Sequence, residues 1–324
     1  MYTRRKFLKT GSALLAGSIL YKHTFAQKFY ADKLSPGSIG VQLFTIPKLL
    51  EKDFAGTMEM LAKIGYKEIE FYGPYPFSAP EAVERWKSLT PQLGFSGSGY
   101  FGQTILQVKD ILQRNGLSTP SMHTDLVTLK TRMGQLAEAA HTLGQKYVVL
   151  PSYTAQADLD AYKRLADDFN EIGQSAAKEG IRFAVHNHGA GLKEINGQIP
   201  LKLILDRTDP KFVAIEMDIY WMTAGGADLL AYLDDYPGRF RLMHVKDMKE
   251  QVHFKGDGGD PKQWMELFPY MTDAGSGVLN LKAILSHAKK AGVQHFLVEH
   301  DTAANPDEAL QKSYRYLSNV QLEG

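Results

Sequence analysis

The chain contains no cysteine among its 324 residues. Disulfide bonds, thiolate metal ligands and a lipidated N-terminal cysteine are therefore excluded, and any bound metal must be held by nitrogen and oxygen atoms. A charge excess is also lacking, because 37 basic and 36 acidic residues give a formal net charge of +1. The basic residues form no run beyond the N-terminus. We therefore expect no nucleic-acid partner.

Apolar segments long enough to span a bilayer are missing from the N-terminal region. The apolar stretch at residues 12–21 is too short to cross a membrane and is interrupted by Gly17. It follows the pair Arg4-Arg5 and precedes small residues that end at Ala26, a pattern that resembles a twin-arginine export signal. We expect residues 1–26 to be read by the twin-arginine export machinery and cleaved near Ala26. The mature domain, residues 27–324, would then be periplasmic, without a stable membrane anchor.

The rest of the chain alternates between short apolar segments and stretches with helical periodicity, with no linker between them. Strands are expected at residues 39–44, 67–72, 119–123, 147–150, 181–186, 213–218, 241–247 and 296–301. Helices are expected at residues 54–64, 80–93, 105–115, 133–143, 159–178, 200–206, 228–236, 281–291 and 307–317. Eight alternating units predict an α/β fold, a (β/α)8 TIM barrel in a single domain. No Gly-x-Gly-x-x-Gly pattern follows the first strand, so a dinucleotide-binding fold has little support.

Three strands in the C-terminal third end on side chains that can bind a metal. These side chains are Asp218, His244 and Glu299, and the residues that lead into Glu299 are wholly apolar. In a β/α barrel the C-terminal ends of all strands meet at one face, so we expect the three side chains to converge. Two carboxylates and an imidazole suit one divalent cation, such as Mn, Co, Zn or Mg.

The fifth strand ends in the sequence His186-Asn187-His188. Because side chains on a strand alternate, both histidines are expected to point into the mouth of the barrel. We expect His186 to be the fourth metal ligand, with His188 as the alternative. A single buried histidine more often satisfies a backbone group, but two histidines beside three other ligand-type strand ends favour a site.

Proton transfer and charge stabilisation have their own candidates. Glu299 is the first choice for the base, and Glu70 and His188 are further candidates. Lys246 lies two residues after His244 on the same strand face, where an ammonium group can stabilise a developing oxyanion. Three other polar residues have structural alternatives. Glu216 could be buried against a helix dipole, and Asp301 could be a surface-loop carboxylate. His123 is expected to be a structural hydrogen-bonding residue or a residue of the rim.

Aromatic residues could line a sugar pocket or pack in the core. The candidates are Tyr100, Phe101, Tyr220 and Trp221.

Several motifs together resemble one known family. They are Val185-His186-Asn187-His188, Ile199-Pro200, Thr208-Asp209-Pro210, the run 216–221, the run 236–240, His244-Val245-Lys246-Asp247, Gly275-Ser276-Gly277 and Val298-Glu299. This set is similar to the sugar phosphate isomerase/epimerase family with a xylose isomerase-like barrel. The resemblance implies a metal-dependent enzyme with ligands at Asp218, His244 and Glu299. It also implies a glutamate at the strand-five position, where this chain has His186.

The resemblance leads us to expect an isomerase or epimerase that abstracts a proton next to a carbonyl group of a sugar. No glycine-rich phosphate-binding loop or arginine cluster is visible, so a non-phosphorylated sugar is favoured. Because His186 replaces one of the paired glutamates of the epimerases, a reaction with a single base stays open. The alternative is a lyase or dehydratase that acts by β-elimination on a 3-keto sugar or keto-glycoside. A third possibility is a sugar-binding protein without turnover.

Overall fold

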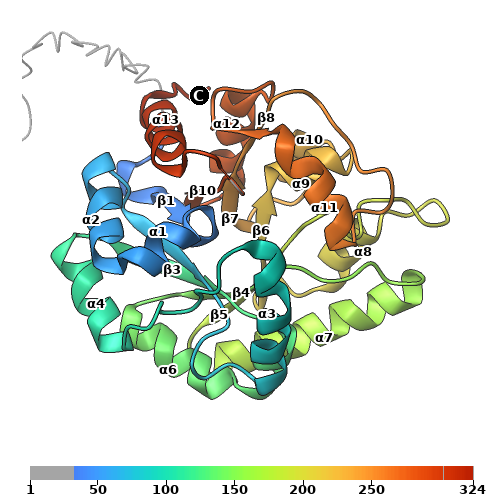
Figure 1. The fold of residues 1–324 in the computed structure, drawn as a ribbon. Coiled ribbons are helices and arrows are strands. Elements are labelled where there is room, and N and C mark those ends of the chain that lie inside the picture. The colour runs from blue at the N-terminus through green and yellow to red at the C-terminus, as the bar shows by residue number, and fades with distance from the viewer. Residues whose placement is uncertain (1–32, 302, 324) are drawn as a thin grey trace, which may run out of the picture. The chain divides into compact units, whose positions relative to one another are not determined.

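The computed structural model describes residues 33–301 and 303–323, in which eight parallel strands form a closed barrel (Figure 1). Around the barrel the strands follow the order β1-β10-β7-β6-β5-β4-β3-β2. Their bounds are β1 (Ile39–Gln42), β2 (Glu68–Tyr72), β3 (Ser118–His123), β4 (Tyr147–Leu150), β5 (Arg182–His186), β6 (Val213–Asp218), β7 (Phe240–Val245) and β10 (His295–Val298). The predicted (β/α)8 barrel is confirmed. The expected export signal, residues 1–26, lies outside the described residues.

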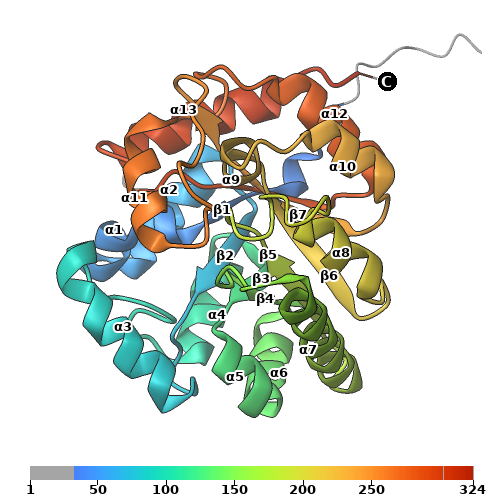
Figure 2. The same cartoon turned by 90° about the vertical axis from the view of Figure 1, so that its right-hand side faces the viewer.

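Helices surround the barrel (Figure 2). They are α1 (Pro47–Lys52), α2 (Phe54–Ile64), α3 (Pro80–Leu93), α4 (Ile105–Arg114), α5 (Leu126–Thr131), α6 (Met133–Leu143), α7 (Leu159–Lys178), α8 (Pro200–Arg207), α9 (Ile219–Ala224), α10 (Leu229–Asp235), α11 (Pro261–Leu267), α12 (Leu281–Ala291) and α13 (Pro306–Asn319). Helices α2, α3, α6, α7 and α12 have the predicted bounds. Among the helices in the described part of the chain, none is both long and apolar enough to cross a bilayer.

Helix α7 shows why the local predictions succeed. The carboxylate of Asp158 accepts a hydrogen bond from the backbone N–H of Ala161 (2.7 Å), which satisfies a free donor in the first turn. Tyr162, Leu165 and Phe169 recur at intervals of three and four residues and are buried on one face. The helix therefore starts at a cap and packs along a stripe, both of which are visible in the sequence.

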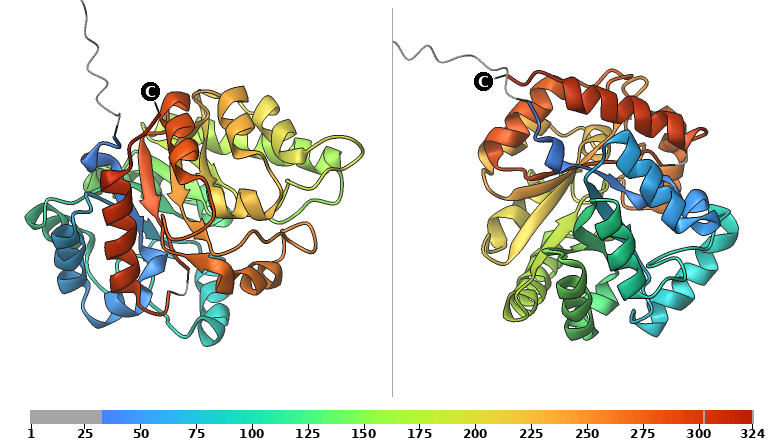
Figure 3. Two further views of the ribbon diagram at one scale, coloured as in Figure 1. Left: turned by 90° about the horizontal axis from the view of Figure 1, so that it is seen from above. Right: turned by 90° about the vertical axis from the view of Figure 1, so that its left-hand side faces the viewer.

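The barrel closes where its first and last strands meet. Strand β1 pairs in parallel with β10, with Val41 opposite Val298. Nearby, the Tyr66 hydroxyl donates a hydrogen bond to the Leu310 carbonyl (2.9 Å), and the Tyr66 and Tyr314 ring centroids lie 5.1 Å apart. Figure 3 shows the C-terminal helix α13 beside the N-terminal helix α2. Both ends of the described chain thus stabilise the closure.

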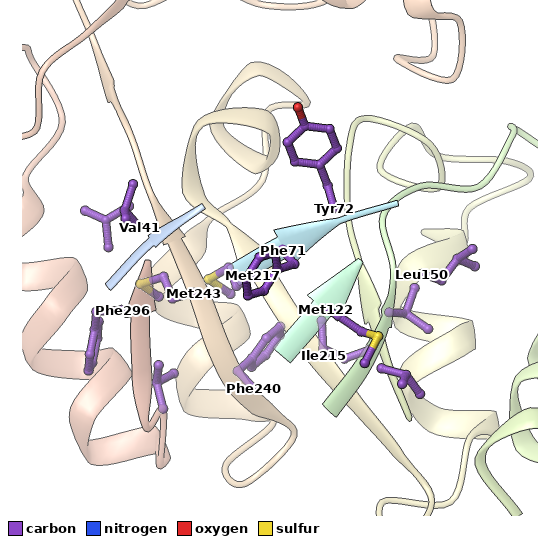
Figure 4. Close-up of a cluster of buried hydrophobic side chains, with 14 of the residues drawn as sticks. Val41, Phe71, Tyr72, Met122, Leu150, Ile215, Met217, Phe240, Met243 and Phe296 are labelled. Atoms are coloured by element: carbon purple, nitrogen blue, oxygen red, sulfur yellow. The ribbon is translucent and has the colours of Figure 1, made fainter. Parts of the chain in front are cut away.

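Side chains on the strands alternate between the helices and the barrel interior. The side chains that face the helices form the large apolar core, part of which is drawn in Figure 4 with Ile215, Met217 and Met243. A second buried apolar cluster is formed by Tyr147, Val149, Ala184, Ala214, Leu242 and Leu297. Two residues further along four of these strands come the polar residues His186, Glu216, His244 and Glu299. The barrel interior therefore has an apolar layer, with a polar layer toward its C-terminal end.

Some segments after the strands differ from the prediction. Helices α1, α5, α9 and α11, together with a short antiparallel pair of β8 (Asp247–Met248) and β9 (Met271–Thr272), are additional elements. The first strand is also shorter than expected. It stops at Gln42 because the Gln42 side chain accepts a hydrogen bond from the N–H of Phe44 (3.1 Å) and caps a 3-10 turn.

Candidate metal centre

The structure brings three of the four predicted metal ligands together above the apolar layer, with the fourth, His186, beside them. His186, Asp218 and His244 lie at or near the C-terminal ends of β5, β6 and β7, and Glu299 directly follows β10. All four side chains are buried. Ligand atoms of Asp218, His244 and Glu299 lie within 4.8 Å of one another. His186 Nε2 lies 3.6 Å from Asp218 Oδ2, at the edge of this group.

Asp218 is held by the neighbouring strand and by the helix that follows it. Asn187 accepts a hydrogen bond from the Asp218 N–H (3.1 Å) and donates one to its carbonyl (3.3 Å). Asp218 Oδ1 accepts from the N–H of Trp221 (2.9 Å) and so caps α9. Its other oxygen, Oδ2, lies 3.1 Å from Lys246 Nζ, 3.6 Å from His186 Nε2 and 3.9 Å from His244 Nδ1, on the side of the other predicted ligands.

The two nitrogens of His244 face different carboxylates. Nδ1 lies 2.8 Å from Glu299 Oε2, on the side of the predicted ligands. Nε2 lies 2.7 Å from Glu70 Oε2 and 3.4 Å from Glu216 Oε2, deeper in the barrel. His244 therefore lies between two polar groups, only one of which was predicted from the sequence.

Lys246 is buried among three carboxylates. Its Nζ lies 2.6 Å from Glu299 Oε2, 2.7 Å from Asp301 Oδ2 and 3.1 Å from Asp218 Oδ2. Burial lowers the pKa of Lys246, but the three carboxylates outweigh it and raise that pKa well above its usual value. The alternative of a surface-loop carboxylate at Asp301 does not hold, because this side chain is buried against Lys246. Burial and the charge of Glu299 raise the pKa of Asp301 to about 6.

A second group of polar side chains lies next to the first. Ligand atoms of His123, His186, Glu216 and His244 lie within 4.8 Å of one another. Glu216 Oε2 is 2.7 Å from His123 Nε2 and 3.0 Å from His186 Nδ1. Glu216 therefore contacts histidines, where a helix dipole was one alternative. The sequence did carry a sign of this position, because Glu216 lies two residues before Asp218 and therefore on the same face of the strand.

Glu70, a predicted candidate for the base, belongs to this second group. Its Oε2 atom accepts a hydrogen bond from Gln42 Nε2 (2.7 Å) and lies 3.2 Å from His123 Nε2. Because Glu70 contacts Nε2 of His244 and Glu299 contacts Nδ1, the two carboxylates lie on opposite sides of that ring. The structure places Glu70 apart from Lys246 and Glu299.

His188 lies beyond the end of β5, in an aromatic environment. Its ring centroid is 4.1 Å from that of Trp264 and 5.4 Å from that of Trp221. Trp221 also stacks on Phe254 at 5.7 Å. In the described residues His188 belongs to neither of the two ligand groups. Tyr100, in contrast, contacts Phe71 and Tyr75 in the core.

The pKa values of the predicted ligands shift in different directions. Burial raises the pKa of Asp218. Burial lowers the pKa of His244, but Glu216 and Glu299 outweigh it and raise that pKa well above its usual value, so a cation would have to displace a proton from this ring. Burial lowers the pKa of His186 well below its usual value, which favours the neutral imidazole that a metal requires. Burial raises the pKa of Glu299, but Lys246 and His244 hold it well below its usual range. Two imidazoles and two carboxylates form a donor set that fits zinc, manganese or cobalt.

Comparison with known proteins identifies the family of the barrel. The sequence profile of the xylose isomerase-like TIM barrel family matches residues 58–320. An inosose dehydratase from Geobacillus thermodenitrificans is 28% identical over 160 residues, which are 47% of this chain and 52% of the relative. The chain thus spans about half the length of the curated relatives it matches.

Solved structures share the fold over most of the chain. A sugar phosphate isomerase/epimerase from Parabacteroides distasonis has a TM-score of 0.68 and 23% sequence identity, covering 89% of this chain and 96% of that chain. The IOLI protein with a bound zinc atom has a TM-score of 0.63 and 16% identity, covering 87% of this chain and 97% of that chain. At these identities the likeness shows the fold.

Proposed function

Because this chain belongs to the xylose isomerase-like TIM barrel family, we propose that it is a metal-dependent enzyme that removes a proton next to a carbonyl group of a non-phosphorylated sugar. The observation that carries the proposal is the convergence of Asp218, His244 and Glu299, whose ligand atoms lie within 4.8 Å of one another beside Lys246. The relatives named inosose dehydratase support a polyhydroxylated ketone as the substrate class.

A divalent cation, when bound, would polarise the substrate carbonyl and stabilise the negative charge that develops on its oxygen. Asp218, His244 and Glu299 would hold it, with His186 as the fourth ligand. The zinc-containing structural neighbour supports this choice of cofactor.

The chain's own charged groups would move the proton. Glu299 is ionised and is the first choice for the base. The Lys246 ammonium would attract the developing oxyanion. Asp301, whose pKa is raised to about 6, is suited to donate a proton near neutral pH.

Two outcomes of proton removal are possible, and elimination has the more specific support. Epimerisation needs a base on each face of the substrate carbon. Here Glu299 would serve as one of the two bases. The position on β5 that would supply the other base carries His186, whose nitrogens face Glu216 and Asp218. A single base suffices for loss of a leaving group from the carbon beyond the one that loses its proton. We therefore favour a lyase or dehydratase acting on a keto sugar, with isomerisation as the second candidate.

Metal content tests the proposed centre. The wild-type protein should bind one divalent ion per chain, and Asp218→Ala, His244→Ala and Glu299→Ala should each lose it, as measured by elemental analysis after dialysis. His295→Ala is the matched control, because His295 is a buried histidine that pairs with Glu68 (2.9 Å) at the start of β10. The control should keep the ion. Full metal content in any of the three variants would contradict the site.

Product analysis tests the reaction. The metal-loaded protein is incubated in D2O with ketoses, inososes and 3-keto-glycosides, and the products are followed by mass spectrometry and NMR. Elimination predicts loss of water or of the aglycone, whereas isomerisation predicts a deuterated product with an unchanged carbon and oxygen composition. Binding of a sugar by a protein that carries no metal and yields no product would support a binding protein instead.

A further inference from the structure

The two histidines of the proposed metal centre each have a second nitrogen directed at a buried glutamate. We propose that Glu70 and Glu216 are positioning residues, which fix the orientation and tautomer of His244 and His186 so that their other nitrogens face the metal. This inference rests on the proposed metal centre and adds a role for residues on β2 and β6 that do not bind the ion.

His244 provides the clearest geometry. Its Nε2 lies 2.7 Å from Glu70 Oε2, whereas its Nδ1 lies 2.8 Å from Glu299 Oε2 and 3.9 Å from Asp218 Oδ2. A proton on Nε2 that is donated to Glu70 leaves the lone pair of Nδ1 available to a cation. The ring is fully buried, and the next carboxylate oxygen after Glu70 Oε2, Glu216 Oε2, is farther from Nε2, at 3.4 Å.

His186 repeats this arrangement with its nitrogens exchanged. Its Nδ1 lies 3.0 Å from Glu216 Oε2, and its Nε2 lies 3.6 Å from Asp218 Oδ2. A proton on Nδ1 that is donated to Glu216 leaves Nε2 free for the metal. Each of the two proposed histidine ligands thus has its own carboxylate partner: Glu70 for His244 and Glu216 for His186.

The two glutamates are themselves fixed by neighbouring side chains. His123 Nε2 lies 2.7 Å from Glu216 Oε2 and 3.2 Å from Glu70 Oε2, and so connects the two. Gln42 Nε2 donates a hydrogen bond to Glu70 Oε2 (2.7 Å). Because strands β1, β2, β3 and β6 supply these groups, the barrel itself sets the orientation of the carboxylates.

A carboxylate behind a metal-bound histidine increases the basicity of the imidazole and prevents its rotation. Loss of such a partner lowers metal affinity by about 10- to 100-fold in other metalloproteins. The alternative is that the two glutamates bind a second cation themselves. Their other oxygens, Glu70 Oε1 and Glu216 Oε1, accept no hydrogen bond from the described residues. A second cation on the glutamates would use these oxygens, and the number of ions bound per chain distinguishes the two arrangements.

The test uses the full-length protein with Zn2+ and Co2+ as probes. Glu70→Gln and Glu216→Gln keep the side-chain shape but replace a charged acceptor by a neutral amide. The matched control is Glu68→Gln, on the same strand as Glu70, because Glu68 is also a buried glutamate that contacts a histidine, His295 (2.9 Å), outside the centre. Metal affinity is measured by chelator competition, the ligand geometry by the visible spectrum of bound Co2+, and folding by thermal unfolding.

The expected result is one ion per wild-type chain, bound about 10- to 100-fold more weakly in Glu70→Gln and in Glu216→Gln, with an altered Co2+ spectrum. Glu68→Gln should bind the ion as the wild type does. Wild-type affinity and spectrum in both glutamine variants of the centre would overturn the inference while leaving the metal centre intact. Two ions per wild-type chain, reduced to one in either variant, would show that the glutamates are ligands and would also overturn it. A wild-type protein that binds no ion would overturn the metal centre itself, and the inference with it.

Discussion

At the scale of single residues, two histidines in one short motif have different surroundings. His186 ends β5 and contacts the carboxylates of Glu216 and Asp218. His188, two residues later, lies beyond the strand and packs against Trp221 and Trp264. Burial lowers the pKa of both imidazoles well below the usual value, so their charge does not distinguish them. Their neighbours do, and these favour His186 as the ligand.

His186→Ala should therefore weaken metal binding by at least about tenfold, because one of about four ligands is lost. His188→Ala should bind the ion as tightly as the wild type, and His186→Glu should retain it because a carboxylate replaces the imidazole. Isothermal titration with Zn2+ measures all three. The assignment is reversed if affinity is unchanged in His186→Ala and lost in His188→Ala.

At the scale of elements, the short strand β8 fixes the loop that follows β9. The buried carboxylate of Asp247 accepts hydrogen bonds at 2.8–3.2 Å from the backbone N–H groups of Met248, Gly275, Gly277 and Leu279. Gly277 is required for this close approach, since a Cβ atom there would lie 2.4 Å from Asp247 Oδ1. Asp247 directly follows Lys246. Two adjacent residues thus supply the ammonium group beside the proposed metal centre and the carboxylate that holds the loop.

Asp247→Ala should lower the free energy of unfolding by about 2–4 kcal/mol, because several backbone donors lose a charged acceptor in a buried site. Urea denaturation followed by circular dichroism measures the change. Asp257→Ala is the control, since this exposed aspartate accepts a loop hydrogen bond from the N–H of Gly259 (2.9 Å), and its loss should cost less than about 1 kcal/mol. Equal effects of the two substitutions would show that Asp247 does not anchor the loop.

At the scale of the whole molecule, we propose that the protein is exported and acts in the periplasm. The support is the Arg4-Arg5 pair followed by a short apolar segment and small residues before Ala26. A barrel that binds its metal before export would suit the twin-arginine route, which carries folded proteins.

Arg4→Lys combined with Arg5→Lys should leave uncleaved precursor in the cytoplasm, because the twin-arginine machinery reads the arginine pair. Cell fractionation and the mass of the purified protein measure this. The control pair, Arg85→Lys with Arg114→Lys, makes the same chemical change at exposed positions of α3 and α4 and should not affect export. Normal processing of the Arg4/Arg5 variant would remove the periplasmic assignment.

The sequence by itself determined the architecture and the convergence of Asp218, His244 and Glu299. Helix caps and apolar periodicity are local properties, which is why α7 and α12 have their predicted bounds. Asp218, His244 and Glu299 follow apolar runs, and parallel strands in a closed barrel bring their C-terminal ends together. Their convergence needs only the order of elements along the chain.

Only the tertiary structure decided which atoms face each other inside the barrel. The positions of Glu70, Glu216 and Asp301 depend on strand register, including the irregularity between Ile215 and Glu216 in the pairing of β6 with β7. Short helices such as α9 have too few turns for a periodic pattern to identify them. The assignment of each histidine nitrogen to one carboxylate arises from contacts between strands far apart in sequence, and no local pattern of residues encodes such contacts.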